Sequence, residues 1–312
     1  MSQSIVVVMD DIAGIAAYKD TTFAMLLEAQ RRGLTVLYAE QPDLSLRGGQ
    51  AVARLRQLAV RDDSRDWFDL GPATVRPLGE GDVVLMRKDP PVDADYINTT
   101  YLLEQAERAG ARVVNRPAGL RDLNEKLSIA LYPDLIAPTL VSSRAEEIRE
   151  FVSSVGQAVL KPLDGMGGRG IFKTGREDAN LNVIIETLTA EGRHLLMAQG
   201  WLDAIADGDK RVLLIDGEPV DYLLARIPGD RDFRGNLARG GRGVGRRLEQ
   251  ADREIARRVG PMLRERGIAF AGIDIIGDRL TEINVTSPTC VRELDEAFGI
   301  NIAGDLFDAI GV

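Results

Sequence analysis

The sequence predicts an α/β protein with α+β lobes: an N-terminal lobe on a mostly parallel sheet, a central lobe, and a C-terminal lobe on antiparallel strands. In the first third of the chain, strand-like apolar runs alternate with helical segments, which is typical of parallel sheets. In the last third, strands follow one another across short turns, which is typical of antiparallel hairpins. The 312 residues suffice for two or three packed lobes. We expect these lobes to span residues 1–122, 123–200 and 201–312.

The first third should contain four strands and two helices. We expect the strands at Ile5–Met9, Leu34–Ala39, Asp82–Met86 and Ala111–Asn115. One helix runs from a cap at Thr21 or Thr22 to Arg32, before Gly33, and the other spans Asp95–Ala109. Open parallel sheets bind ligands beyond the carboxyl ends of their strands. Asp10-Asp11 and Arg87-Lys88 follow two of these strands, so both pairs should lie at such an edge.

The central third has a different pattern, with short strands around a glycine-rich loop. Asn124–Leu131 is expected to be helical, and Ser143 with Glu146 should form a capping box for a helix through Ser154. A third helix should span Asn182–Thr189. The expected strands are Leu140–Ser142, Ala158–Lys161, Ile171–Thr174 and His194–Ala198.

The last third should form two hairpins and a long helix. Arg211–Ile215 and Pro219–Ile227 flank Asp216-Gly217, which suits a type I′ turn. Glu249–Arg266 is expected to be helical. Ile268–Ile276 and Leu280–Thr286 should pair as the second hairpin.

Composition narrows the class of function. Hydrophobic residues make up 45% and charged residues 28%, the profile of a soluble globular enzyme. The net charge of −9 disfavours a nucleic-acid partner, because phosphate backbones attract basic surfaces. Cys290 is the single cysteine, no apolar run is long enough to cross a bilayer, and the N-terminus lacks a basic leader. We therefore expect a cytoplasmic protein without a membrane partner, in which the single histidine, His194, is structural.

The glycine loop Asp164–Gly170 contains a GxGxxG pattern, which is weak evidence by itself. A dinucleotide-binding loop must open a helix, and a Walker A loop needs Lys and Ser/Thr after its last glycine. Here strand-like Ile171–Thr174 follows instead. A glycine flap over nucleotide phosphates and an ordinary glycine-rich turn both remain open. Lys161, at the end of the strand before the loop, favours the flap, because it could pair with phosphate charge.

Asp274, Glu282 and Asn284 form the strongest local group of polar residues. Glu282 and Asn284 share one face of a strand. If Gly277–Arg279 is a three-residue loop, Asp274 lies opposite Glu282, and the two carboxylates repel unless a cation lies between them. Two carboxylates and an amide oxygen suit Mg²⁺. The alternative is a set of polar side chains on the wet face of a sheet.

An Arg/Gly-rich stretch runs from Ala225 to Arg247. Such a segment is attracted to anions and could close over a phosphorylated intermediate to exclude water. A solvated loop and an RNA-binding segment are the alternatives, and the acidic remainder of the chain disfavours the second.

Together these motifs resemble the ATP-grasp superfamily and, within it, the bacterial glutathione synthetase family. The stretches that carry the resemblance are Met86–Pro91, Asn124–Lys126, Leu160–Gly168, Asp207–Arg211 and Asp274–Thr289. The resemblance implies an ATP-grasp fold and a ligation in which ATP phosphorylates the cysteinyl carboxylate of γ-glutamylcysteine. The amine of glycine then attacks the acyl phosphate, which gives glutathione, ADP and phosphate. It also implies a homotetramer.

The resemblance assigns a role to each matching position. Lys126 and Lys161 would contact the ATP phosphates, and Arg87 would bind the dipeptide. Catalytic roles fall to Arg211, Arg226 and Asn236, which would face the reacting phosphoryl and acyl groups. The Mg²⁺ ligands, with Mn²⁺ as a possible substitute, would be Asp274, Glu282 and Asn284. The remaining ATP contacts would come from the flap, the adenine hinge and a ribose carboxylate: Met166, Gly167, Gly168, Gln199, Gly200, Trp201, Leu202 and Asp209.

Two other functions fit parts of this pattern. Another ATP-grasp ligase, such as one that joins two alanines, would share the flap and the metal strand but would not be expected to carry the Arg87 segment. A non-catalytic ATP-binding module would be expected to lack Lys161 or a metal ligand, and this chain retains both.

Overall fold

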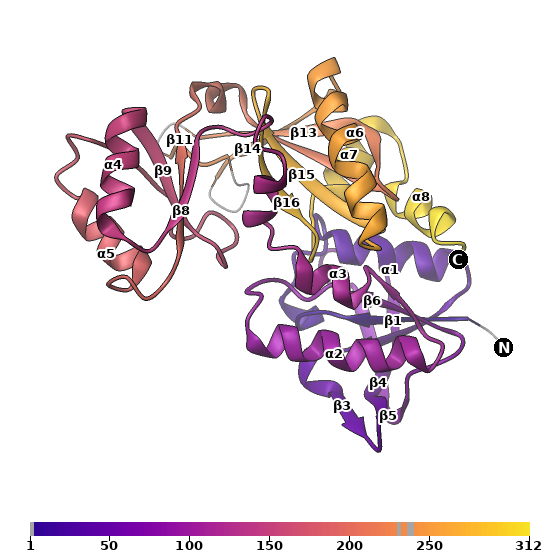
Figure 1. Ribbon diagram of the computed structural model, residues 1–312. Coiled ribbons are helices and arrows are strands. Elements are labelled where there is room, and N and C mark those ends of the chain that lie inside the picture. The colour runs from indigo at the N-terminus through magenta and orange to yellow at the C-terminus, as the bar shows by residue number, and fades with distance from the viewer. Residues whose placement is uncertain (1–2, 230–231, 236–239) are drawn as a thin grey trace.

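Three separate β-sheets organise the chain, as the sequence predicts (Figure 1). The computed structural model describes residues 3–229, 232–235 and 240–312. The central lobe projects away from the other two, which pack together, and both chain ends lie on the same side of the molecule. The sheets use the strand ranges 4–114, 139–200 and 209–284. The exact limits of the three domains remain a prediction.

The N-terminal sheet has seven strands, ordered β3-β4-β2-β1-β6-β7, with β5 paired to β4. Strands β1, β2, β6 and β7 are parallel, as predicted. The strands of this sheet are β1 Ser4–Val8, β2 Thr35–Ala39, β3 Leu44–Arg47, β4 Gln50–Val60, β5 Phe68–Pro77, β6 Asp82–Met86 and β7 Arg112–Val114. The antiparallel strands β3–β5 were not predicted.

Alternate residues of β1 pack on opposite faces of this sheet. Val6 lies in one apolar core with Tyr96 of α2 (Ala94–Arg108), and Val7 lies in another with Phe23 of α1 (Thr21–Arg31). A short helix, α3 (Pro117–Asp122), follows β7.

The expected cap at Thr21 or Thr22 is wrong. Asp20 is the N-cap of α1, and its carboxylate accepts a 2.7 Å hydrogen bond from the Phe23 N–H. A carboxylate serves this position well, because the first N–H groups of a helix lack partners within the helix. Thr21 and Thr22 are instead the first helical residues, and their hydroxyls reach other parts of the fold.

The central lobe is a four-stranded antiparallel sheet, ordered β10-β9-β11-β8. Its elements are β8 Thr139–Ser142, α4 Ala145–Val155, β9 Gln157–Pro162, β10 Phe172–Gly175, α5 Leu181–Thr189 and β11 Leu196–Gly200. The predicted capping box at Ser143 is wrong: Arg144 is the N-cap of α4 and makes no side-chain cap bond. The Ser142 hydroxyl accepts from the Arg144 N–H instead.

The segment before the central lobe is less helical than expected. Within Asn124–Leu131, only Leu127–Leu131 forms a 3₁₀ helix. Backbone hydrogen bonds run from Ile283 N–H to the Glu125 carbonyl (2.8 Å) and from Leu280 N–H to the Leu135 carbonyl (2.9 Å). The segment is therefore fixed against β16 (Arg279–Asn284) of the C-terminal sheet.

The C-terminal lobe is a five-stranded antiparallel sheet, ordered β14-β13-β12-β15-β16. Its remaining elements are β12 Asp209–Ile215, β13 Glu218–Ile227, β14 Arg242–Arg247, α6 Gln250–Glu265, β15 Phe270–Ile276, α7 Val291–Phe298 and α8 Ile302–Ala309. The predicted type I′ turn agrees with positive φ angles at Asp216 and Gly217, 46° and 73°. Helix α6 packs on one face of this sheet, and α7 and α8 pack on the other.

Candidate active site

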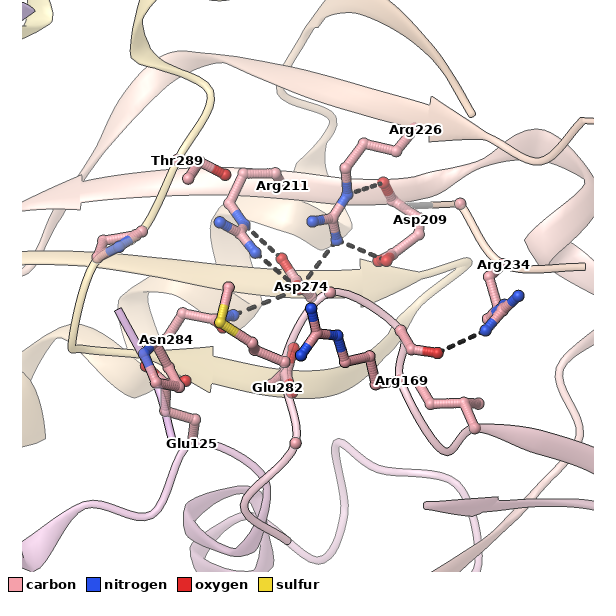
Figure 2. Close-up of a pocket in the computed structure, with 18 of the residues that line it drawn as sticks. Glu125, Arg169, Asp209, Arg211, Arg226, Arg234, Asp274, Glu282, Asn284 and Thr289 are labelled. Atoms are coloured by element: carbon pink, nitrogen blue, oxygen red, sulfur yellow. Dashed lines mark hydrogen bonds and ion pairs between the residues drawn. The ribbon is translucent and has the colours of Figure 1, made fainter. Parts of the chain in front are cut away.

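All three lobes contribute to one large pocket of about 730 Å³. Its wall includes the segments that follow β1 and β6, the glycine loop, the end of β11 and the inner strands of the C-terminal sheet. Figure 2 shows charged side chains of both signs converging there. The predicted site residues that line the pocket are Lys126, Lys161, Met166, Gly167, Gly168, Gln199, Gly200, Trp201, Leu202, Asp209, Arg211, Arg226, Asp274, Glu282 and Asn284.

A buried ion cluster on β12, β13 and β15 lies at the centre of this wall (Figure 2). Asp274 Oδ1 accepts from Arg211 Nε at 2.6 Å, and Asp274 Oδ2 lies 2.9 Å from Arg226 Nη2. Asp209 Oδ2 lies 2.5 Å from the same Arg226 nitrogen. The antiparallel register explains this meeting, because Arg211 pairs directly with Asp274 and Asp209 pairs with Arg226.

Burial and charge act in opposite directions on the carboxylates of this cluster. Burial opposes ionisation of Asp274, but Arg211 and Arg226 outweigh it and hold the pKa of Asp274 below its usual value. For Asp209 burial prevails over Arg226, and the pKa is raised. The Oδ1 atom of Asp209 is buried without a hydrogen-bond partner in the described structure. This oxygen is therefore available to accept a hydrogen bond from a bound molecule.

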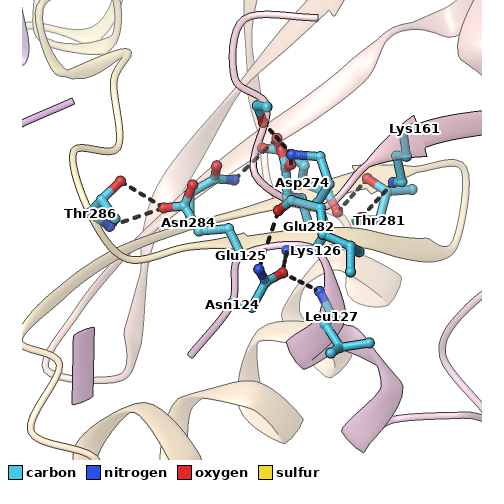
Figure 3. Close-up of polar contacts among 12 residues, drawn as sticks. Asn124, Glu125, Lys126, Leu127, Lys161, Asp274, Thr281, Glu282, Asn284 and Thr286 are labelled. Carbon is cyan, nitrogen blue, oxygen red and sulfur yellow. Dashed lines mark hydrogen bonds and ion pairs between the residues drawn. The ribbon is translucent and has the colours of Figure 1, made fainter. Parts of the chain in front are cut away.

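A second group of charges lies beside this cluster on β16 and the 124–126 segment (Figure 3). Lys126 Nζ lies 3.1 Å from Glu282 Oε1 and also donates to the Gly165 carbonyl of the glycine loop. Glu125 Oε1 accepts from the N–H groups of Val285 and Thr286, at 2.9 and 3.0 Å. Burial, followed by repulsion from Glu282, raises the pKa of Glu125.

The predicted pairing of Asp274 with Glu282 is confirmed, but the predicted loop is wrong. Ile276 pairs with Arg279 across Gly277-Asp278, so the turn has two residues instead of three. An irregularity between Asp274 and Ile275 restores the alignment. The Thr281 hydroxyl donates to the Asp274 carbonyl at this point.

The donor set of Asp274, Glu282 and Asn284 fits a magnesium ion. Mg²⁺ takes one or two protein carboxylates and completes its shell with phosphate and water oxygens. Within the described residues, no group of three or more His, Cys, Asp or Glu side chains is arranged to hold a metal ion. Arg211, Arg226 and Lys126 already balance the two carboxylates, so their repulsion alone does not demand a metal.

Lys161 and the glycine loop occupy the adjoining wall. Lys161 lies near the end of β9, is only 7% exposed, and donates to the Thr281 carbonyl at 3.3 Å. Burial lowers the pKa of Lys161 to about 8, while Glu282 acts against that shift. The loop is irregular backbone between β9 and β10, with positive φ at Gly167, Gly168 and Gly170. This strand–loop–strand context is the one predicted for a flap.

The hinge residues Gln199, Gly200, Trp201 and Leu202 follow or end β11. Gly200 N–H donates to the Pro138 carbonyl and Trp201 N–H to the Gln157 carbonyl, each at 2.9 Å. These two N–H groups are thus used within the protein.

Two predicted site residues are not placed in the pocket. Arg87 is buried behind its wall, where it donates to the Thr22 hydroxyl and the Pro288 carbonyl, each at 3.0 Å. Asn236 lies outside the described residues. The polar pairs after β1 and β6 were predicted to lie together at the carboxyl edge of the sheet. This is confirmed, because Lys88, after β6, and Asp10, after β1, form a 2.6 Å ion pair.

The structure adds pocket residues to which the sequence assigned no individual role. Arg169 of the glycine loop lines the pocket, and Arg234 donates to the Gly168 carbonyl at 2.6 Å (Figure 2). Lys19 and Glu293 also line the pocket. Glu125 could have been found from its position beside Lys126, but the others reach the pocket only through tertiary packing.

Comparisons with known proteins cover nearly the whole chain. The family model "Prokaryotic glutathione synthetase, N-terminal domain" matches residues 4–121, and "Prokaryotic glutathione synthetase, ATP-grasp domain" matches residues 125–299. The chain belongs to the prokaryotic glutathione synthetase family. It is 62% identical over 310 residues to the glutathione synthetase of Xanthomonas campestris pv. campestris, covering 99% of this chain and 98% of the relative. It is 56% identical over 305 residues to that of Yersinia pestis, covering 97% and 96%.

Solved structures of more distant proteins share the fold. D-cycloserine synthetase DcsG superposes with a TM-score of 0.65 at 14% identity, covering 98% of each chain. ATP-grasp ligase PsnB with its minimal precursor gives a TM-score of 0.63 at 22% identity, covering 99% of this chain and 98% of the other. These likenesses establish the ATP-grasp fold that the motifs predicted.

Membership of this family makes the chain an ATP-dependent ligase of the glutathione synthetase type. No helix among the described residues is long and apolar enough to cross a membrane.

Proposed function

We propose that this ligase joins γ-glutamylcysteine to glycine through an acyl phosphate, at the expense of ATP. The observation that carries the proposal is the convergence of Lys161, the glycine loop and the Arg211–Asp274–Arg226 cluster on one pocket. A carboxylate is a poor electrophile, and phosphorylation turns one of its oxygens into a leaving group. The protein then has to position the reactants and stabilise the developing charge.

The phosphate end of ATP would lie between the glycine loop and the two lysines. Lys126 and Lys161 are buried cations that face this space, and loop N–H groups can approach phosphate oxygens closely where side chains are absent. The adenine would lie at the hinge, residues 199–202, with Asp209 near the ribose. The unpartnered Oδ1 of Asp209 supports an acceptor role at that carboxylate.

Asp274, Glu282 and Asn284 would hold Mg²⁺, with Mn²⁺ as a possible substitute. When bound, the ion supplies positive charge to the phosphate oxygens and orients them. Arg211 and Arg226 already face the same space and would stabilise the phosphoryl and acyl oxygens. Arg226 bridges Asp209 and Asp274, so its guanidinium is held in place before any substrate binds. Arg87 would shape the dipeptide site, and Asn236 would complete the set.

The test is a turnover assay with each substrate omitted in turn. We expect release of ADP only when γ-glutamylcysteine and glycine are both present. Equal turnover with glutamate as donor or D-alanine as acceptor would overturn the assignment. Tight ATP binding without any turnover would also overturn it.

Family resemblance further supports a cytoplasmic homotetramer. Sedimentation equilibrium of the purified chain, whose monomer mass is 34.0 kDa, tests this part: a mass four times larger supports it and a monomer contradicts it.

A further inference from the structure

Two of the proposed metal ligands, Glu282 and Asn284, lie on an edge strand. In the described structure, β16 has β15 as its only strand neighbour in the C-terminal sheet. An edge strand has a row of backbone N–H groups without partners in its own sheet. Where such groups are buried, they need partners from elsewhere in the fold. Whatever binds this edge therefore determines how firmly the two ligands are held.

Glu125 binds the edge of β16 on both sides of Asn284 (Figure 3). Its backbone carbonyl accepts from the Ile283 N–H at 2.8 Å, and its Oε1 atom accepts from the N–H groups of Val285 and Thr286 at 2.9 and 3.0 Å. The Thr286 hydroxyl donates to the same oxygen at 2.8 Å. All three donor residues are at most 2% exposed, so water does not replace these bonds. A single residue thus takes the place that a neighbouring strand would occupy.

The side chain of Asn284 has a defined direction between these bonds. Its Nδ2 donates to Asp274 Oδ2 at 3.3 Å, which leaves the amide oxygen available to a cation. A short side chain follows its own backbone closely, so a shift of the end of β16 would move this oxygen. The bonds from Glu125 to the residues immediately before and after Asn284 oppose such a shift.

The segment that carries Glu125 is itself held in place. Asn124 Oδ1 accepts from the N–H groups of Lys126 and Leu127, at 3.1 and 2.8 Å. Its Nδ2 donates to the Leu163 carbonyl at 3.2 Å, which attaches the segment to the base of the glycine loop. Glu125 is therefore presented to β16 from a fixed support.

We propose that Glu125 is a positioning residue of the metal site: its side chain closes the edge of β16 and holds Asn284 so that the amide oxygen can bind Mg²⁺. The role depends on the reach of the side chain to three donors and not on its negative charge. Groups that orient metal ligands are commonly worth about 10- to 100-fold in metal affinity. This inference rests on the proposed function, since it concerns the ion that the ligase would use.

A role for the charge of Glu125 is the alternative. Glu125 lines the pocket and is close enough to Glu282 for their charges to interact. Its carboxylate could then be a metal ligand in its own right. Its Oε1 atom already accepts three hydrogen bonds, however, and a metal ion at that oxygen would displace them.

Two substitutions separate reach from charge. Glu125→Gln keeps the length of the side chain and an acceptor oxygen but removes the charge, whereas Glu125→Asp keeps the charge and shortens the side chain by one methylene. The measurement is calorimetric binding of ADP to the full chain with and without Mg²⁺. We expect Glu125→Asp to reduce the gain in ADP affinity from Mg²⁺ about 10-fold, and Glu125→Gln to reduce it less than about threefold. Without Mg²⁺, both variants should bind ADP as the wild type does.

Asp122→Asn is the matched control. Asp122 is a carboxylate three residues earlier, 52% exposed, outside the pocket and 2.7 Å from Arg266. Its substitution should leave ADP affinity unchanged under both conditions. Thr286→Val removes one of the three donors and keeps Glu125, so it should reduce the effect of Mg²⁺ in the same direction but less. This variant also tests the proposal if Glu125→Asp does not fold.

The proposal would be overturned by a larger loss with Glu125→Gln than with Glu125→Asp, which would show that the charge acts. Equal losses of ADP affinity with and without Mg²⁺ would also overturn it, because they would show a general disturbance of the pocket. So would a response to Mg²⁺ in Glu125→Asp, or in Thr286→Val, that equals the wild-type response. A wild-type protein whose ADP affinity does not respond to Mg²⁺ would instead refute the proposed metal site itself.

Discussion

Asp274→Asn tests whether the buried cluster holds Arg211 and Arg226, the two arginines that we propose to be catalytic. The substitution keeps the shape of the side chain and removes its charge. Arg211 and Arg226 are then left with side-chain exposures of 6% and 5% and one counter-charge fewer. Removal of one partner of a buried ion pair costs about 3–5 kcal/mol. Arg226 keeps Asp209 at 2.5 Å, so we expect the lower end, about 3 kcal/mol of unfolding free energy.

For a chain of this size, such a loss corresponds to a fall in Tm of about 5 °C. The measurement is thermal unfolding of the unliganded protein, together with ligase activity. Glu282→Gln is the matched control: its carboxylate is 23% exposed and pairs with Lys126, and its loss relieves repulsion with Glu125. Lys126 is itself only 5% exposed, so the loss of its partner has a cost, which we expect to be about 1–2 kcal/mol and smaller than for Asp274→Asn, while activity is also abolished. A Tm for Asp274→Asn within 1 °C of the wild-type value would refute this account of the cluster.

Three further predictions concern the charge of Lys161, the contact between the N-terminal and C-terminal lobes, and the packing of α6. Burial lowers the pKa of Lys161 to about 8, so kcat/KM for ATP should fall as the pH rises through this value and the lysine loses its charge. Lys161→Arg should move this decrease in kcat/KM to higher pH, and a pH profile that the substitution leaves unchanged would show that Lys161 does not contact the phosphates. Asn115→Ala should lower the free energy of unfolding, measured in urea, by about 2–4 kcal/mol. Asn115 makes three buried hydrogen bonds, two of them with Phe270, and these bonds join the N-terminal and C-terminal lobes. A loss below about 1 kcal/mol would contradict this estimate. Gly260→Ala should lower Tm although alanine favours helices, because a Cβ at this position would lie 2.1 Å from the Gly217 carbonyl oxygen. A higher Tm would show that α6 shifts away from Gly217 without cost.

Local patterns in the sequence predicted the parts of the fold that depend on neighbouring residues. The parallel strands of the first lobe and the Asp216-Gly217 turn are examples, because hydrophobic runs and turn residues act over short distances. The antiparallel strands β3–β5 were missed even though β4 alternates in burial and Gly48-Gly49 precedes it.

The site was predicted less completely because its geometry depends on long-range contacts. The pairing of Asp274 with Glu282 was right, yet it depends on a bulge that no local pattern indicated. Asp274 binds Arg211 and Arg226 because three strands align, and this cannot be read from spacing in the chain. Glu293 reaches the pocket only because α7 packs against the start of α1.

The path of one oxygen atom tests the central claim most directly. If ATP phosphorylates the donor carboxylate and the amine of glycine then displaces phosphate, one carboxylate oxygen must leave with that phosphate. We predict that γ-glutamylcysteine labelled with ¹⁸O in its cysteinyl carboxylate gives inorganic phosphate containing one ¹⁸O atom per peptide bond formed. Unlabelled phosphate, with peptide formed at the normal rate, would contradict an acyl phosphate and with it the proposed mechanism.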